Sequence, residues 1–288
     1  MRLLVVNPFA SGVTEERIAD VTAALGDVEV RRTEHRGHAT DLVREHPQAE
    51  AVYVFSGDGG FNEALNGIGP DTPVGFVPGG GASVLPRALG LPDDPVRAAE
   101  QLAQGRTRRI SVGRVNGRRF GFAAGIGLDA EAVRRIEGRG RSDDGARAGN
   151  LAFAWELGRL VAQHRGRFDP SLEVLGRGRA AFALVANCDP YTYAGPLPVR
   201  IAPEARFELG IDLVAPRAVS PFSLPRLLVY ALLGRGQAGA GDVLYAHDLD
   251  RVEIVCDAPM PLQADGEDLG DVTSAIFESE RSAVTVLI

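Results

Sequence analysis

Apolar segments of strand length alternate with helical segments over the first hundred or so residues, and this alternation limits the fold more than any other feature. The strand-like segments are Leu3–Val6, Val28–Arg32, Val52–Phe55 and Val74–Val77. The helical segments are Thr14–Leu25, His38–Glu45, Phe61–Leu65, Ala82–Leu89 and Pro95–Leu102. Alternation of this kind favours a parallel sheet covered by helices. We therefore predict an α/β domain over residues 1–107.

The pattern changes after Arg106 to short segments of alternating polarity separated by Gly, Pro and Asp, which is typical of antiparallel strands. Two helical segments interrupt it, Asn150–Gln163 and Ser223–Leu233. The run Gly138–Gly149 has no apolar anchor and is interpreted as a mobile surface loop. A chain of 288 residues is long enough for two domains, so residues 108–288 are assigned to a second, β-rich domain.

Composition excludes several classes of protein. All 31 basic side chains are arginine, so phosphate loops, protein kinases and Schiff-base enzymes that depend on a lysine are ruled out. A net charge of −7 gives no indication of nucleic-acid binding. The two cysteines, Cys188 and Cys256, form neither a disulfide framework nor a thiolate metal site. We expect a cytoplasmic protein without a transmembrane segment, with at most transient membrane association.

The third strand-like segment leads directly into the glycine-rich turn Ser56-Gly57-Asp58-Gly59-Gly60 and then into a helix. Such a turn lets backbone N–H groups approach a phosphate at a helix N-terminus. Asp58 would repel phosphate unless Mg²⁺ or a hydroxyl proton lies between them, which indicates chemistry on the phosphate. The alternative is a structural turn in which Asp58 caps the helix and the glycines supply positive φ.

Three other loops follow strands of the same predicted sheet, namely Asn7–Gly12, Thr33–Ala39 and Pro78–Ser83. Ligands of parallel sheets bind beyond the carboxyl ends of the strands. Four loops of this kind on one edge predict a continuous cradle for a nucleotide. Because lysine is absent, Arg36 and Arg87 are candidates to neutralise phosphate charge.

The order of these motifs resembles the diacylglycerol kinase catalytic-domain family, which includes bacterial lipid kinases and sphingosine kinases. The matching segments are NPFASG, TEHRGHATDL, SGDGGFNEALNGI, PGGGASVLPRALGLP, FGFAAGIGLDAEAV and PLQADGEDLG. The third is similar to the family signature Gly-Gly-Asp-Gly-Thr-x-Asn-Glu-x-x-Asn-Gly, with Ser56 matching the sphingosine-kinase version of its first position. The resemblance covers essentially the whole chain.

The resemblance implies a domain like that of NAD kinases, a C-terminal antiparallel β-sandwich domain, and ATP with Mg²⁺ in a cleft between them. The implied nucleotide contacts are Asn7, Ser11, Thr33, Ser56, Gly57, Gly59, Gly60, Asn62, Gly80, Gly81 and Ser83. Asp58 would work near the transferred phosphate, and Asp265 and Glu267 would reach over from the second domain. Bacterial relatives point to Glu267 as the base, whereas the sphingosine-kinase branch points to Asp58, and the sequence leaves both open. Asp129 would face the lipid hydroxyl or cap the helix Ala130–Ile136.

Some positions depart from the family pattern. Gly60 and Gly81 replace hydroxyl side chains, and Val84 and Ser111 align with aspartates of Gram-positive diacylglycerol kinases, which leaves Glu208 as the nearest acidic candidate for their magnesium network. We expect a kinase that phosphorylates a diacylglycerol-like or sphingoid-like lipid at the membrane surface, with a homodimer left open. The alternatives are a degenerate nucleotide-binding homologue and a kinase of a soluble acceptor such as NAD.

The chain also has two helices with conspicuous apolar side chains. Trp155 lies on the predicted helix Asn150–Gln163, and Ser223–Leu233 is almost entirely apolar. We predict that both pack in the core, with a membrane-skimming role as the alternative for Ser223–Leu233.

Overall fold

The computed structural model describes residues 1–138, 150–194 and 197–288 and divides them into two compact units. Unit 1 comprises residues 1–111 and 282–288, and the described residues from 112 to 281 form unit 2. The predicted boundary after residue 107 lies four residues from this division, and the last seven residues pack with the first unit. Residues 139–149 of the predicted surface loop lie outside the described residues.

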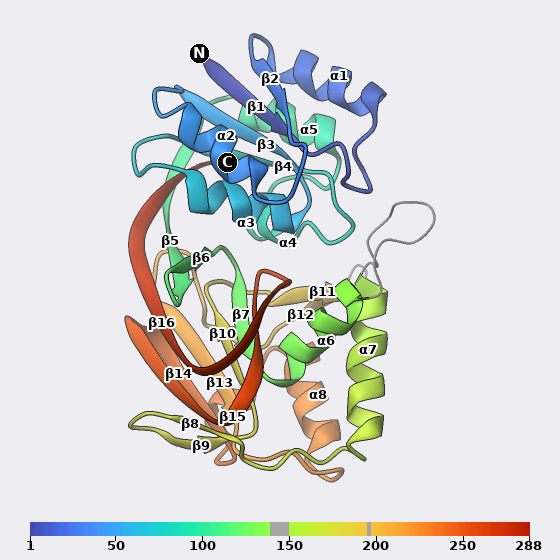
Figure 1. The fold of residues 1–288 in the computed structure, drawn as a ribbon, viewed down its shortest axis with the longest axis vertical. Coiled ribbons are helices and arrows are strands. Elements are labelled where there is room, and N and C mark those ends of the chain that lie inside the picture. The colour runs from blue at the N-terminus through green and yellow to red at the C-terminus, as the bar shows by residue number, and fades with distance from the viewer. Residues whose placement is uncertain (139–149, 195–196) are drawn as a thin grey trace. The chain divides into compact units, whose positions relative to one another are not determined.

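Unit 1 is built on a parallel sheet with the strand order β4-β3-β1-β2 (Figure 1). The strands are β1 (Arg2–Val6), β2 (Glu29–Arg32), β3 (Ala51–Ser56) and β4 (Val74–Pro78). Every residue of β3 is buried, as expected of a central strand covered on both faces. The parallel α/β architecture predicted for this part of the chain is confirmed.

Five helices cover this sheet. They are α1 (Glu15–Leu25), α2 (His38–Glu45), α3 (Asp58–Gly67), α4 (Val84–Ala88) and α5 (Pro95–Leu102). Helix α1 packs against α5, and α2 packs against α3. Helices α1 and α5 have side-chain N-caps. Thr14 Oγ1 accepts from Arg17 N at 3.2 Å, and Asp94 Oδ1 accepts from Arg97 N at 2.9 Å.

Unit 2 is rich in antiparallel strands, in agreement with the predicted fold class. The strands of this part are β5 (Thr107–Val115), β6 (Arg118–Phe120), β7 (Ala123–Ile126), β8 (Leu172–Val174), β9 (Gly178–Ala180), β10 (Ala183–Ala186), β11 (Thr192–Ala194), β12 (Leu197–Val199), β13 (Ile211–Pro216), β14 (Val243–Leu249), β15 (Arg251–Ala264) and β16 (Glu267–Leu287). The order β14-β13-β10-β7-β15-β16 is antiparallel at every pairing, and the end of β16 adds to β4 in unit 1 through Val286 and Val74.

The helices of unit 2 are α6 (Leu128–Gly138), α7 (Asn150–Gln163) and α8 (Leu224–Leu233), with a short 3₁₀ helix at Gln237–Gly239. Their positions match the prediction, but the predicted burial is wrong. Trp155 on α7 is exposed, and α8 has no buried residue. Leu227 is the residue of α8 that packs against a small core cluster, so a single stripe of the helix is covered. Among the described residues, no helix is long and apolar enough to cross a membrane.

Candidate active site

Three of the four predicted loops of unit 1 are joined by direct hydrogen bonds. Asn7 Nδ2 donates to Ser56 Oγ at 3.2 Å, which links the first loop to the third. Gly12 N donates to Gly79 O at 2.9 Å, and Gly79 N donates to Ser56 O at 2.7 Å, which ties the fourth loop to both. The carboxyl ends of β1, β3 and β4 therefore carry one continuous loop surface.

The glycines of these loops are needed for close approach. A Cβ atom added to Gly80 would lie 2.7 Å from Gly57 Cα, and one added to Gly12 would lie 3.0 Å from Gly79 O. Gly57 has φ −92°, and no glycine of the Ser56–Gly60 turn has a positive φ. The alternative interpretation, in which these glycines supply positive φ, is therefore wrong.

Gly60 lies against Ser56. A Cβ atom added to Gly60 would lie 2.2 Å from Ser56 Oγ and 2.7 Å from Ser56 Cβ. Ser56 is fully buried, and its hydroxyl is held by Asn7. The serine hydroxyl therefore occupies the space that the side chain of a threonine at position 60 would enter. This chain thus has glycine at position 60, where the family pattern has threonine, together with serine at position 56, where the pattern has glycine.

Asp58 is the first residue of α3, and Gly57 is its N-cap without any side-chain cap. The interpretation of Asp58 as an N-cap of a helix that begins at Phe61 is wrong. Its carboxylate accepts instead from Leu85 N in α4, at 3.4 Å. Because the first backbone hydrogen bond of the helix runs from Phe61 N to Gly57 O, the N–H groups of Gly59 and Gly60 have no partner within the described chain.

The Asn-Glu pair that follows the turn makes hydrogen bonds within unit 1. Asn62 is fully buried, and its side-chain oxygen accepts from Asn66 Nδ2 at 3.2 Å, so its nucleotide contact stays a prediction. Glu63, which the sequence analysis did not select, accepts from Gly37 N at 2.8 Å and from Ala39 N at 3.2 Å. It thereby caps α2 and fixes the second loop. Its place in the family signature was the signal that could have identified it.

The remaining predicted contacts of unit 1 lie in different surroundings. Thr33 is buried at the end of β2, and its N–H donates to Val6 O at 2.8 Å. Ser11 and Gly81 are exposed. Ser83 is buried with φ +46°, and its hydroxyl donates to Gly80 O at 3.1 Å. Of the two arginines, Arg36 is exposed and Arg87 pairs with Asp93 at 3.2 Å.

In unit 2, Asp265 and Gly266 form the two-residue turn between β15 and β16. Both have positive φ, 49° and 78°, which is the conformation of a tight hairpin turn. The buried Asp265 carboxylate accepts from the backbone N–H groups of Gly121, Phe122 and Ala123 at 2.6, 3.0 and 3.2 Å. Asp265 therefore holds the segment before β7 in place.

Glu267 begins β16 directly after this turn and is buried. One carboxylate oxygen lies 2.5 Å from Arg118 Nη2 on β6. The Glu267 carboxylate is therefore paired with a partly exposed guanidinium.

Asp129 lies in a buried hydrogen-bond network. Its Oδ2 accepts from Tyr191 Oη at 2.5 Å and from Gln263 Nε2 at 2.8 Å, and Gln263 Oε1 in turn accepts from Gly266 N at 3.0 Å. Its Oδ1 is buried without a hydrogen-bond partner among the described residues. Burial raises the pKa of Asp129 despite the hydrogen bonds from Tyr191 and Gln263. No local motif marks Tyr191 or Gln263, so the sequence alone does not identify them.

Glu208 is exposed in the turn before β13. Across residues 1–138, 150–194 and 197–288, no group of three or more His, Cys, Asp or Glu side chains is placed to hold a metal ion. The assignment of Glu208 to a metal site therefore stays a prediction.

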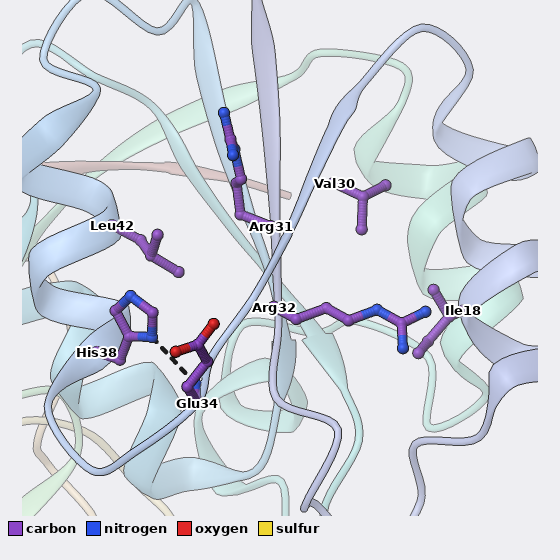
Figure 2. Close-up of a pocket in the computed structure, with 7 residues that line it drawn as sticks. All are labelled: Ile18, Val30, Arg31, Arg32, Glu34, His38 and Leu42. Atoms are coloured by element: carbon purple, nitrogen blue, oxygen red, sulfur yellow. Dashed lines mark hydrogen bonds between the residues drawn. The ribbon is translucent and has the colours of Figure 1, made fainter.

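An open hollow lies beside the edge strand β2 (Figure 2), lined by Ile18, Val30, Arg31, Arg32, Glu34, His38 and Leu42. Glu34 N donates to His38 Nδ1 at 3.0 Å, as the dashed line in Figure 2 marks, and Arg32 donates to both oxygens of Glu15 at 2.6 and 2.7 Å. None of the predicted site residues lines this hollow, so it is separate from the joined loops.

Comparison with known proteins finds relatives for parts of the chain. Residues 2–115 match the model of the diacylglycerol kinase catalytic domain. The diacylglycerol kinase of Bacillus subtilis is 37% identical over 97 residues, which are 32% of either chain. That of Staphylococcus carnosus is 38% identical over 80 residues, 26% of either chain. A relative from Streptococcus pneumoniae is 29% identical over 165 residues, so the match spans about half of that protein, 54% of its length.

Solved structures extend the likeness of fold to the whole chain. A diacylglycerol kinase from Bacillus anthracis has a TM-score of 0.72 with 20% identity, covering 99% of this chain and 96% of that one. An NAD kinase from Archaeoglobus fulgidus in complex with ATP has a TM-score of 0.52 with 13% identity, covering 100% and 94%. The fold is therefore shared with these solved structures, and residues 2–115 match the family model of the diacylglycerol kinase catalytic domain.

Proposed function

We propose that this protein is an ATP- and Mg²⁺-dependent lipid kinase that transfers the γ-phosphate to a hydroxyl of a diacylglycerol-like or sphingoid-like lipid at a membrane surface. The observation that carries the proposal is the joined loop surface at the carboxyl ends of β1, β3 and β4, with Asp58 at the start of α3. The match of residues 2–115 to the diacylglycerol kinase catalytic domain supports the kinase class.

The residues at this surface fit the phosphates of ATP. Gly59 and Gly60 offer N–H groups without partners in the described chain, at a helix N-terminus that favours anions. The close approach of Gly57 and Gly80 brings the third and fourth loops together with no side chain between them. Because the chain has no lysine, these N–H groups and arginine side chains would carry the positive potential. When bound, ATP supplies the phosphoryl group and Mg²⁺ neutralises its charge.

The carboxylates have different roles in the proposal. Asp265 has a positioning role, because its carboxylate already accepts hydrogen bonds from three backbone N–H groups of residues 121–123. Asp58 and Glu267 remain the candidates for the base. Asp58 has partial solvent access and a long contact to Leu85 N, which suits a ligand of Mg²⁺ or of the acceptor hydroxyl. Glu267 is buried beside the Arg118 guanidinium, and a carboxylate in such a pair is a candidate proton acceptor.

A second candidate function is that of a nucleotide-binding homologue without kinase activity. Gly81 is the observation that favours it, because this exposed position has no side chain and no neighbouring atom within 4 Å of an added Cβ. No hydroxyl is therefore supplied where the family pattern has one. Gly60 gives less support to an inactive homologue, because Ser56 Oγ lies where the side chain of a residue at position 60 would be.

The test is a transfer assay with labelled ATP, Mg²⁺ and a panel of lipid alcohols in mixed micelles, with NAD as a soluble acceptor in a parallel reaction. We expect label in the lipid fraction and none in NAD. Label in NAD without any lipid would replace the proposal by a kinase of a soluble acceptor. Confirmed ATP binding with no transfer to any acceptor would favour the inactive homologue.

A further inference from the structure

Helix α8 has two apolar faces, and the outer one is uncovered. The outer face consists of Pro225, Leu228, Val229, Leu232 and Leu233, which follow the spacing of one side of a helix. The exposed fractions of Leu228, Val229, Leu232 and Leu233 are 53%, 48%, 55% and 55%. Phe222, just before the helix, is 95% exposed. We call these six residues the α8 face.

The α8 face is unusual because large exposed apolar groups on a soluble domain mark an interaction surface when they are contiguous. A helix that only covers a core carries polar residues on its outer side. Helix α8 has one charged residue, Arg226, whose guanidinium pairs with Asp242 and lies 5.5 Å from the ring centroid of Tyr230. Its outward apolar residues therefore need a partner that accepts hydrocarbon.

The chain segments next to α8, and the segment paired with them, are rich in arginine. Figure 1 shows α8 among the elements of unit 2. The segment before α8 pairs with residues 164–169 through an antiparallel β-bridge between Phe168 and Val219. Residues 164–169 and 217–242 together contain five arginines and two aspartates, a net charge of +3, whereas the whole chain carries −7. Arg167, Arg217 and Arg235 are exposed and form no ion pair within the described part of the chain.

We propose that the α8 face docks on an anionic lipid bilayer, with Phe222 and the helix leucines entering the interface and the arginines facing lipid headgroups. An apolar helix face with basic flanks is the pattern of helices that lie in a membrane interface. The inference rests on the proposed function in one respect, since a lipid acceptor gives the protein a reason to reach a bilayer.

A second copy of the chain is the weaker partner for this face. In a two-fold dimer the same patch meets itself, so the surrounding arginines of both copies would be brought together. Like charges in contact at an interface are unfavourable. An anionic bilayer instead complements the basic surroundings and accepts the apolar side chains in one event.

The test is sedimentation of the full chain with vesicles of phosphatidylcholine, with and without about a third phosphatidylglycerol, in the absence of ATP and of any acceptor lipid. We expect binding to the anionic vesicles that weakens as salt is raised. Insertion of two half-exposed leucines should raise the affinity for vesicles roughly tenfold to hundredfold. The Leu228→Ser/Leu232→Ser variant should therefore bind vesicles at least tenfold more weakly than the wild type. Arg167→Gln/Arg217→Gln/Arg235→Gln should lose the preference for anionic vesicles.

Matched control variants distinguish binding through the α8 face from non-specific binding of vesicles by other exposed residues. Val255 on β15 is 45% exposed, close to the 48% of Val229, so Val255→Ser should leave binding unchanged while Val229→Ser weakens it. Arg97→Gln on α5 is the control for charge, because Arg97 is exposed and outside this region. Far-ultraviolet circular dichroism checks that each variant is folded.

The proposal is overturned if the wild type does not bind anionic vesicles, or if the leucine variant binds as well as the wild type. Loss of a dimer in light scattering on Leu228→Ser/Leu232→Ser, without vesicle binding by the wild type, would assign the face to a second copy. Turnover with a short-chain, water-soluble diacylglycerol keeps the two proposals apart, since it tests the kinase without a bilayer. A failure of vesicle binding leaves that activity intact, and a failure of the kinase leaves vesicle binding intact.

Discussion

Replacement of Gly60 by threonine restores the residue of the family pattern, and the structure predicts that it is harmful in this chain. The new Cβ would lie 2.2 Å from Ser56 Oγ and 2.7 Å from Ser56 Cβ. Rotation of the serine side chain moves Oγ but leaves Cβ where it is. The clash must therefore be relieved by a shift of β3 or of the first turn of α3, and β3 is buried along its whole length.

Overpacking of this kind costs about 1–3 kcal/mol, reduced by a few tenths because threonine is a better helix former than glycine. Ser56→Gly alone loses the hydrogen bond from Asn7, roughly 1 kcal/mol, and adds the backbone freedom of a glycine, about 0.5–1 kcal/mol. In Ser56→Gly/Gly60→Thr the nearest remaining atom to the new Cβ is Asn7 Nδ2 at 3.9 Å, which is an ordinary contact. The double variant should therefore cost no more than Ser56→Gly alone, a favourable coupling of about 1–3 kcal/mol.

Urea unfolding of the wild type, the two single variants and the double variant measures this coupling. Gly81→Thr is the matched control, because nothing lies within 4 Å of a Cβ atom added at Gly81, and its stability should stay within about 0.5 kcal/mol of the wild type. The idea that Ser56 Oγ fills the space of a threonine side chain at position 60 is refuted if Gly60→Thr is as stable as the wild type and the effects of the two changes on the free energy of unfolding are additive.

Three further predictions concern the carboxylates. Asp58→Asn should keep the acceptor for Leu85 N and leave the urea midpoint unchanged, yet lower lipid phosphorylation by about a hundredfold or more if the charge acts on Mg²⁺ or the acceptor; normal turnover would remove Asp58 from the catalytic groups. Asp265→Asn should lower stability by roughly 1–3 kcal/mol, since one amide oxygen cannot serve the N–H groups of Gly121, Phe122 and Ala123, and a wild-type midpoint would contradict this structural role. Burial raises the pKa of Asp129 in the folded chain, so its contribution to stability is fully present below the unfolded pKa and is lost as pH rises through the folded pKa. Asp129→Asn should therefore gain stability relative to the wild type between acidic and neutral pH, and a difference that does not change with pH would count against the shift.

The parallel half of the fold could be predicted because its signals are local. Apolar runs of strand length, helix caps such as Thr14 and Asp94, and glycines after each strand lie within a few residues of the elements they define. The contact of the loops after β1, β3 and β4 followed from the rule that parallel strands end at one edge of the sheet.

Other features depend on residues that are distant in the chain. The network of Asp129, Tyr191 and Gln263 joins residues 62 and 134 positions apart, and the space at Gly60 is set by the rotamer of Ser56. Apolar composition also did not determine burial: α8 is as apolar as a core helix, but the structure covers one of its faces. The turn Asp265-Gly266 had a local hairpin signal that the sequence analysis did not use.

The most direct test of the central claim is the turnover of lipid acceptor by wild type and Glu267→Gln, with ATP affinity measured by calorimetry on the same preparations. We expect Mg²⁺-dependent transfer of phosphate to a lipid hydroxyl by the wild type. If Glu267 is the base, the Glu267→Gln protein should bind ATP with unchanged affinity but transfer phosphate more slowly. ATP binding by the wild type without transfer to any lipid alcohol would contradict the central claim.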